Sequence, residues 1–297
     1  MIISRIAPTP SGFLHKGNAF NFLLTWLLVR KHQGHLHLRI DDIDQQRVRT
    51  AYLEDIFISL EWLGIDWDSG PESIQDHLEA HSQILRLSVY EKFLQNLQDQ
   101  GLLFACTCSR KEVLSQSQDG TYPGSCSQLG RKFDDQHTAW RINTPWPLTR
   151  AWNDTGMKYQ AWNADPSLKD AIVRKKDGSP SYQITSIVDD LRMKINLIVR
   201  GQDLIGSSVF QQWIMDQSAL HHPIQWHHHS LLRDQMGQKL SKSAGARSLR
   251  DQYQADKSSD ELIREFARWM GWIEFRGHTA QALLQFVSQQ NLLPQLI

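Results

Sequence analysis

The sequence predicts an α/β protein whose Rossmann-like parallel sheet is split by an inserted α+β subdomain and followed by a small helical C-terminal subdomain. One observation is the order of strand, turn, buried helix and second strand within residues 1–44. This βαβ order implies a parallel sheet with a right-handed crossover. Another observation is a run of short strand-like pieces over about residues 102–185, after which strand–helix alternation resumes.

The first half of the main domain is expected over residues 1–101. The turn at 7–12 contains Pro, Gly and Ser, so no regular element can continue through it. The helix at 19–29 is apolar nearly all round, which is typical of a buried helix. The expected elements are a strand at 1–6, a helix at 19–29, a strand at 36–40, a helix at 52–63 ended by Gly64, and a helix at 78–100 ended by Gly101.

The rest of the chain divides into an inserted subdomain at 102–185, the second half of the main domain at 186–245 and a helical tail at 246–297. In the insert, short strands are expected at 102–106, 138–142 and 171–174. A strand around 195–199 and a helix at about 208–220 then restore the strand–helix alternation.

The composition is that of an ordinary globular protein, with 40% hydrophobic and 22% charged residues among 297. Lys+Arg and Asp+Glu both total 32, so overall charge does not indicate a nucleic-acid binder. The longest apolar run, 22–29, is far shorter than the roughly 20 residues needed to cross a bilayer. The N-terminus shows neither the basic region nor the cleavage site of a signal peptide. We therefore expect a cytoplasmic monomer that does not engage a membrane.

A first phosphate-binding element is predicted where the first strand meets the first helix. Open α/β sheets bind ligands at the carboxyl ends of their strands, and a helix N-terminus favours phosphate. Gly12 and Gly17 lack side chains, so a nucleotide can approach the backbone closely. His15 can donate a hydrogen bond to a phosphate oxygen during attack at the α-phosphorus, although it could instead merely cap the turn.

A second element is the segment Lys239-Leu240-Ser241-Lys242-Ser243, which lies between Gly237 and Gly245. Its two lysines form a mobile cationic loop that could close over a triphosphate and stabilise the transition state and the leaving pyrophosphate. Such loops are common and often without function. Paired with the first element, however, this loop indicates activation of a small carboxylic acid with ATP.

These two elements resemble the HIGH and KMSKS signatures of class I aminoacyl-tRNA synthetases. His15 and Gly17 hold their signature positions, whereas Lys16 and Asn18 depart from the second and fourth, and the Pro-rich lead-in is characteristic of the glutamyl branch. The resemblance covers about residues 1–245 and implies ATP, Mg²⁺ and an aminoacyl-adenylate intermediate. It assigns catalysis to His15, Lys239 and Lys242, and ATP binding to Ser11, Gly12, His15, Gly17, Asn18 and Lys242.

Further segments resemble the glutamyl branch at 5–9, 39–44, 182–190 and 199–204. Glutamate carries two carboxylates, for which Arg5 and Arg200 are natural partners because a guanidinium can bind a carboxylate bidentately. Alternatively, the two arginines lie on a strand end and a turn, and Tyr182 is a half-buried aromatic. The resemblance implies a glutamate site formed by Arg5, Ile6, Ala7, Pro8, Thr9, Asp41, Tyr182 and Arg200.

Asp41 stands where the family usually has glutamate, at the position that should face the substrate ammonium. Because aspartate is one methylene shorter, the contact must lengthen, use a water molecule or draw the substrate inward. This departure bears on the affinity for glutamate and on the identity of the amino acid.

A metal site is predicted in the insert, because all three cysteines lie within 21 residues, at Cys106, Cys108 and Cys126. A cytosolic chain is not expected to form disulfides there, so a tetrahedral zinc site is the better interpretation, with three free thiols as the alternative. The pattern resembles glutamyl-queuosine tRNA(Asp) synthetases, which implies Tyr122 as fourth ligand of one structural Zn²⁺. Gln128 stands where other glutamyl-tRNA synthetases have histidine.

Five histidines, at positions 221, 222, 227, 228 and 229, could suggest a second metal site. Neither their spacing nor their context supports one. We expect solvated loop and strand residues.

Only the 54 residues 244–297 follow Ser243, which is less than the large helical anticodon-binding region of a full glutamyl-tRNA synthetase. The resemblance therefore implies a ligase that activates L-glutamate and transfers it to queuosine in the anticodon loop of tRNA(Asp). The alternatives are an enzyme that acylates a tRNA 3′ end or a non-RNA acceptor, and a non-enzymatic paralogue that only binds tRNA or proteins.

Overall fold

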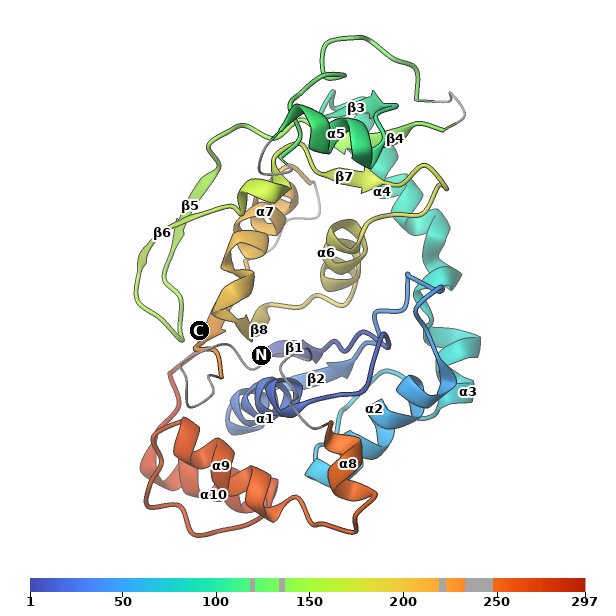
Figure 1. Cartoon of the computed structure of the whole chain (residues 1–297). Coiled ribbons are helices and arrows are strands. Elements are labelled where there is room, and N and C mark those ends of the chain that lie inside the picture. Colours follow the sequence, from blue (N-terminus) through green and yellow to red (C-terminus); the bar gives the residue numbers. More distant parts are fainter. Residues whose placement is uncertain (118–120, 134–136, 219–222, 233–247, 297) are drawn as a thin grey trace.

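The structure of the chain is a computed structural model that describes residues 1–117, 121–133, 137–218, 223–232 and 248–296 (Figure 1). Two parallel strands begin it, β1 (Ile3–Ile6) and β2 (His35–Leu38), paired from Ile3 with His35 to Ile6 with Leu38. Helix α1 (Lys16–Lys31) connects them, which confirms the predicted βαβ order.

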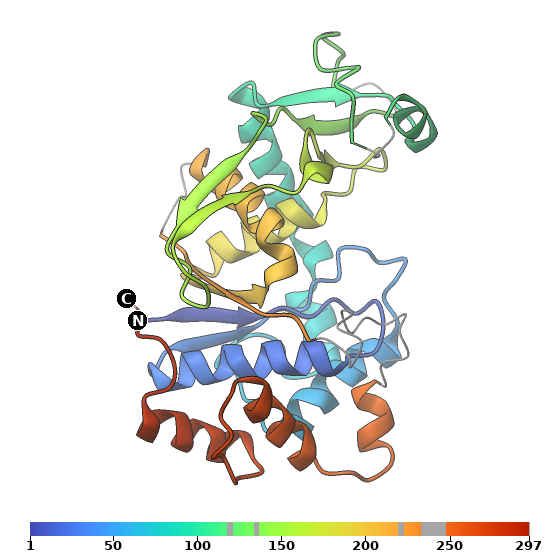
Figure 2. The ribbon, with the colours of Figure 1, turned by 60° about the vertical axis from the view of Figure 1, so that its left-hand side comes forward.

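Helix α1 is buried almost all round, as its sequence predicts. Nearly every residue from Ala19 to Val29 is buried. The helix lies between the β1–β2 strands on one side and helices α9 (Asp260–Trp269) and α10 (Ala280–Gln290) on the other (Figure 2). One hydrophobic core therefore joins the N-terminal strands to the C-terminal helices.

A second parallel pair consists of β8 (Leu197–Gly201) and β9 (Gln225–His229). It lies beside β1, because the N–H of Asn196 donates to the carbonyl of Ile3 over 2.9 Å and the Ser4 hydroxyl donates to the carbonyl of Leu197 over 2.8 Å. Parts of the chain almost 200 residues apart are thus side by side. The turn η4 (Gln202–Leu204) and helix α7 (Ile205–Asp216) lead from β8 to β9.

Residues between these pairs form smaller sheets. The antiparallel order β3-β4-β7 joins β3 (Leu103–Cys106), β4 (Ala139–Ile142) and β7 (Ile172–Arg174), within a residue or two of the predicted strands. An unpredicted hairpin, β5 (Thr149–Trp152) with β6 (Gln160–Asn163), lies beside α7 (Figures 1 and 2). Helices α5 (Arg110–Gln116) and α6 (Tyr182–Arg192) and the turn η3 (Pro166–Leu168) complete this region.

Helix α2 (Thr50–Leu63) ends at Gly64, whose φ of 70° is the left-handed conformation expected of a capping glycine. The single helix predicted at 78–100 is wrong. The chain instead forms α3 (Ile74–Asp76), the π-helical turn η1 (His77–His81), the 3₁₀ turn η2 (Gln83–Arg86) and α4 (Leu87–Asp99).

The interruption has a physical cause at Ser82, which leaves the helical conformation with ψ of 140°. Its hydroxyl donates to Asp42 over 2.5 Å, and the N–H of Gln83 donates to the same carboxylate over 2.8 Å. Binding a buried carboxylate therefore outweighs helix continuity at this point.

The C-terminal part begins with helix α8 (Leu249–Tyr253), whose N-cap is Ser248. A salt bridge links α9 to the start of α1, with Lys16 Nζ 2.5 Å from Glu265 Oε2. Among the residues that the structure describes, we find no helix long and apolar enough to span a membrane.

Candidate active site

A cavity of about 450 Å³ opens where β1 and β8 end and α1 begins. Its walls bring together ten of the predicted site residues from distant parts of the sequence. The loop from β1 contributes Arg5, Ala7, Pro8, Thr9 and Ser11, the start of α1 contributes His15, Gly17 and Asn18, and the opposite wall contributes Tyr182 and Arg200.

Three predicted residues do not line this cavity. Ile6 is 1% exposed and its side chain belongs to the hydrophobic core. Gly12 lies in the loop before α1, and Asp41 is buried beside Arg39. Lys239 and Lys242 lie outside the described residues.

His15 is the N-cap of α1. Its Nδ1 accepts the N–H of Gly17 over 3.0 Å, and its own N–H donates to Asn18 Oδ1 over 3.0 Å. A Cβ added to Gly17 would lie 3.0 Å from the imidazole Cε1, so a side chain at this position would press against the ring. Because Nδ1 is an acceptor, the neutral ring carries its proton on Nε2, the nitrogen suited to donate to a phosphate oxygen.

The two ends of the segment 233–247 border this cavity. Leu232 lines it, and Ser248 forms a β-bridge with His15. The N–H of Leu249 also donates to the carbonyl of Leu14 over 2.8 Å. The described residues on either side of the segment that contains the two predicted lysines therefore lie at this cavity.

Arg200 is the last-but-one residue of β8 and is 5% exposed. Its Nη1 donates to Gln211 over 2.9 Å and to Ser208 over 3.4 Å, and its guanidinium lies 5.1 Å from the Trp226 ring centre. Nη2 is buried and has no hydrogen-bond partner among the described residues. Burial lowers the pKa of Arg200 to about 10, so the side chain stays charged at neutral pH.

Arg5 is also buried, but it has an anionic partner. Its Nε donates to Asp190 over 2.8 Å, and Arg39 donates to the same oxygen over 2.6 Å. Burial alone would raise the pKa of Asp190, but Arg5 and Arg39 outweigh burial and lower it. Arg39 also binds Asp41 over 2.6 Å, so the Asp41 carboxylate is already engaged within the protein.

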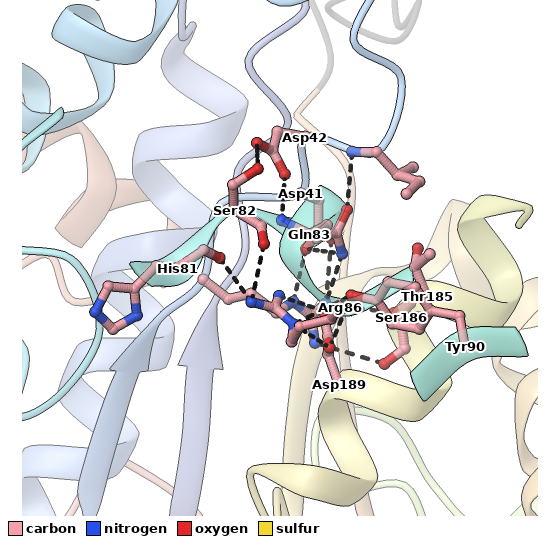
Figure 3. A network of polar contacts seen from close by, with 12 residues as sticks. Asp41, Asp42, His81, Ser82, Gln83, Arg86, Tyr90, Thr185, Ser186 and Asp189 are labelled. Atoms are coloured by element: carbon pink, nitrogen blue, oxygen red, sulfur yellow. Dashed lines mark hydrogen bonds and ion pairs between the residues drawn. The ribbon is translucent and has the colours of Figure 1, made fainter. Parts of the chain in front are cut away.

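Figure 3 shows the polar network that continues from Asp41. Gln83 donates to both Asp41 and Asp189, over 3.3 and 3.0 Å. Asp189 also accepts from Arg86 over 2.9 Å and from Tyr90 over 3.0 Å. These residues come from the segment after β2, from η2 and α4, and from α6, so the network ties these parts of the chain together (Figure 3).

Sequence reasoning missed several cavity residues, among them Asn21, Asp203, His229 and Trp269. Asn21 and His229 lie 3.1 Å apart through their Nδ2 and Nε2 atoms, and His229 contacts the edge of Trp269. A polar residue in the apolar stretch 19–29 was the available signal for Asn21.

The expectation of solvated histidines is wrong for positions 227 and 228, whereas His229 is half-buried; all three lie on a strand, β9. His227 and His228 are 5% and 0% exposed. Their imidazoles find hydrogen-bond partners in half-buried Thr155, at 2.9 Å, and in buried Asp154, at 2.5 Å. The histidines at 221 and 222 lie outside the described residues.

The three cysteines form one cluster, with their Sγ atoms within 4.8 Å of one another. Tyr122 Oη lies 3.5 Å from Cys106 Sγ and accepts the N–H of Cys126 over 2.8 Å. Burial raises the pKa of Cys126, but hydrogen bonds from Tyr122 and the Thr107 backbone outweigh it and lower the pKa to about 6. Three clustered thiols with one facing phenol match the donor number of a tetrahedral zinc site.

Comparison with known proteins identifies the family. The family described as "tRNA synthetases class I (E and Q), catalytic domain" matches residues 1–295. A glutamate–tRNA ligase 2 from Acidithiobacillus ferrooxidans is 35% identical over 84% of this chain and 54% of that protein. A glutamyl-Q tRNA(Asp) synthetase from Rhodobacter capsulatus is 31% identical over 89% of this chain and 98% of that protein.

Among solved structures, the glutamate–tRNA synthetase of Elizabethkingia anophelis has a TM-score of 0.69 at 24% identity, over 82% of this chain and 53% of that one. The chain thus spans about half the length of the glutamate–tRNA ligases that it matches. The family match covers nearly all of its residues. The chain belongs to the class I tRNA synthetases (E and Q).

Proposed function

We propose that this chain activates L-glutamate with ATP as glutamyl-adenylate and transfers the glutamyl group to queuosine in the anticodon loop of tRNA(Asp). The observation that carries the first half of this proposal is the juxtaposition of Arg5 and Arg200 with the N-terminus of α1 in one cavity. Carboxylate-binding groups at one side and a phosphate-binding helix end at the other suit formation of an acyl-adenylate.

Glutamate is the amino acid that this cavity supports best. Arg200 keeps a buried N–H without a partner among the described residues, and such a donor is costly unless a bound group satisfies it. A carboxylate bound between Arg5 and Arg200 would do so, with Tyr182 at the rim as a neutral donor. We assign the backbone of Ile6, Ala7, Pro8 and Thr9 to the same subsite, and Asp41 to the ammonium end through its buried network.

ATP would lie along Ser11, Gly12, Gly17 and Asn18, with its phosphates at the N-terminus of α1. His15 would donate from Nε2 to the α-phosphate as charge develops there, since its Nδ1 is held by Gly17. We assign Lys239 and Lys242 to the triphosphate, because the ends of their segment border the cavity. Mg²⁺ bound with ATP would supply charge neutralisation on the phosphates.

The acceptor is inferred from a named relative and from the cysteine cluster. The Rhodobacter capsulatus glutamyl-Q tRNA(Asp) synthetase is 31% identical to this chain, and Tyr122 faces the three cysteines, as the resemblance to that group implies. The alternative is an enzyme that acylates a tRNA 3′ end or a non-RNA acceptor, which the higher identity to a glutamate–tRNA ligase favours.

Cys106, Cys108, Tyr122 and Cys126 would hold one structural Zn²⁺, which would stiffen the region 102–185 that we propose as an insert splitting a Rossmann-like sheet. We propose the same division for the rest of the chain, with residues 1–101 and 186–245 as the two halves of the main domain and residues 246–297 as the helical C-terminal subdomain. Because one copy contains all of these side chains, we expect a monomer.

Pyrophosphate exchange tests the first step, with glutamate, glutamine and aspartate as separate substrates and no tRNA present. We expect exchange with glutamate alone. Transfer is then measured to tRNA(Asp) with and without queuosine, and only the queuosine-containing tRNA should accept the label. Equal acylation of both tRNAs would support the alternative, whereas no exchange with any amino acid would refute the proposed activity.

A further inference from the structure

A continuous buried chain of polar groups runs from the β5–β6 hairpin loop to Arg200. Asp154 Oδ2 lies 2.5 Å from His228 Nδ1, and His228 Nε2 lies 2.8 Å from the Ser208 hydroxyl. Ser208 in turn accepts from Arg200 Nη1 over 3.4 Å. All of these side chains except Arg200, at 5%, are less than 4% exposed.

The direction of each hydrogen bond follows from the chemistry of the partners. Burial lowers the pKa of His228 although Asp154 opposes the shift, so the neutral imidazole is favoured. Asp154 is an acceptor and therefore fixes the His228 proton on Nδ1. His228 Nε2 is then an acceptor, at 2.8 Å, for the Ser208 hydroxyl proton, for which the Leu204 carbonyl is a second, longer acceptor at 3.1 Å. The lone pairs of Ser208 accept from Arg200.

Asp154 is itself held rigidly against β9. Its Oδ1 accepts the N–H of His228 over 2.9 Å and that of Gly156 over 3.0 Å, and Thr155 donates from its backbone to Trp226 over 2.9 Å. A Cβ on Gly156 would lie 2.4 Å from the carbonyl oxygen of His228, so only glycine permits this approach. The hairpin loop is therefore fixed to the strand next to β8.

The order Asp, His, Ser resembles the hydrogen-bond order of a hydrolytic triad, but burial excludes that chemistry here. Ser208 is 0% exposed and does not line the cavity, so no substrate carbonyl can reach its oxygen. Its near neighbour is instead the guanidinium of Arg200, which does line the cavity. The series of hydrogen bonds therefore ends on a guanidinium that lines the cavity.

We propose that Asp154, His228 and Ser208 are positioning residues that set the orientation of Arg200 for the substrate carboxylate. Ser208 and Gln211 both accept hydrogen bonds from Nη1, and Trp226 lies against the face of the guanidinium. The Nη2 edge of the guanidinium is therefore presented to the ligand. This inference rests on the proposed function, because it takes Arg200 as the carboxylate partner of glutamate.

The chain offers a matched control in His227. It lies on the same strand, is 5% exposed and pairs with the Thr155 hydroxyl over 2.9 Å, but within the described part of the chain its side chain has no hydrogen bond to Asp154, Ser208 or Arg200. Replacing either histidine with phenylalanine keeps a ring and removes a buried imidazole. A purely structural role predicts the same consequence for both variants.

The test measures pyrophosphate-exchange kinetics for wild type, Ser208→Ala, His228→Phe and His227→Phe. We expect Ser208→Ala to raise KM for glutamate about ten-fold, the size of one weakened hydrogen bond to a charged group. Its KM for ATP and its kcat should stay within about two-fold. His228→Phe should likewise raise KM for glutamate while leaving KM for ATP and kcat nearly unchanged. His227→Phe should leave KM for glutamate within about two-fold of wild type.

Unchanged KM for glutamate in Ser208→Ala overturns the inference while leaving the proposed function intact. So does an equal rise in His227→Phe, or a parallel rise in KM for glutamate and ATP. Wild type without glutamate-dependent exchange overturns both. If His228→Phe does not fold, Ser208→Ala, which removes one oxygen from a helix, still decides the question.

Discussion

The two arginines at the cavity, Arg5 and Arg200, are held in opposite ways. Arg5 pairs with the carboxylate of Asp190, which it shares with Arg39. Arg200 is held by the neutral acceptors Gln211 and Ser208 and by the face of Trp226. One guanidinium is therefore ion-paired inside the protein, whereas the other has no ion pair among the described residues.

This difference assigns different tasks to the two side chains. A buried charge without an anionic partner is costly, and the cost is recovered when a carboxylate binds. Arg200 should therefore dominate the affinity for glutamate, whereas the Arg5–Asp190–Arg39 group should dominate the stability of the site. The following substitutions test that division.

Removing the Asp190 charge should have the largest effect on folding. Asp190→Asn leaves Arg5 and Arg39 without their shared anion, and we expect the free energy of unfolding to fall by about 3–5 kcal/mol. The folded-state pKa of Asp190 is lowered, so its contribution is present above the ordinary value of 3.8 and is lost as pH falls through the folded pKa. Urea unfolding should show a constant difference from wild type near neutral pH that shrinks under strongly acidic conditions.

Asp216→Asn is the control for that comparison. Asp216 pairs with Arg150 over 3.3 Å at the surface, with side chains 32% and 35% exposed, so its loss should change the free energy of unfolding by about 1 kcal/mol at most. Equal destabilisation by the two substitutions would contradict the role given to Asp190.

Arg200→Lys should have the largest effect on activity. A lysine supplies a point charge and cannot contact Ser208 and a substrate carboxylate in the same plane. We expect kcat/KM for glutamate to fall about 100-fold, within the range for losing a buried charged contact. Arg5→Lys should cost less, about ten-fold, because a lysine can still pair with Asp190.

Pyrophosphate exchange measures both variants, with exposed Arg264→Lys on α9 as the control. A greater loss for Arg5→Lys than for Arg200→Lys would reverse the division between the two arginines.

The resemblance to the glutamyl branch and the chemistry of a guanidinium singled out the two arginines, and both line the cavity. The supports of those arginines were not predictable. Asp190 follows Arg5 by 185 positions, and Asp154 precedes His228 by 74. Periodicity indicates which side of a strand is buried, but it does not indicate which distant polar group lies opposite. The histidines of β9 were therefore expected to be solvated.

Local patterns failed for the same reason at Ser82. The apolar spacing over 78–100 fits a single helix, and nothing nearby interrupts it. The interruption comes from Asp42, forty positions away, which binds the Ser82 hydroxyl. By contrast, Gly64 satisfies a local requirement of a helix end and was predicted at its position, whereas capping by His15 was only the alternative to its predicted phosphate role.

Tyr182→Phe should have the smallest effect and sharpens the distinction between charged and neutral contacts. Tyr182 begins α6, the helix that carries Asp190, and lines the cavity while 42% exposed. Loss of one neutral hydroxyl should raise KM for glutamate by about three- to ten-fold, and Tyr159→Phe, at a 68% exposed tyrosine away from the cavity, should have no effect. If Tyr182→Phe matched the loss in Arg200→Lys, a neutral hydrogen bond would be equivalent to the guanidinium. The uncompensated charge of Arg200 would then not be what selects a carboxylate.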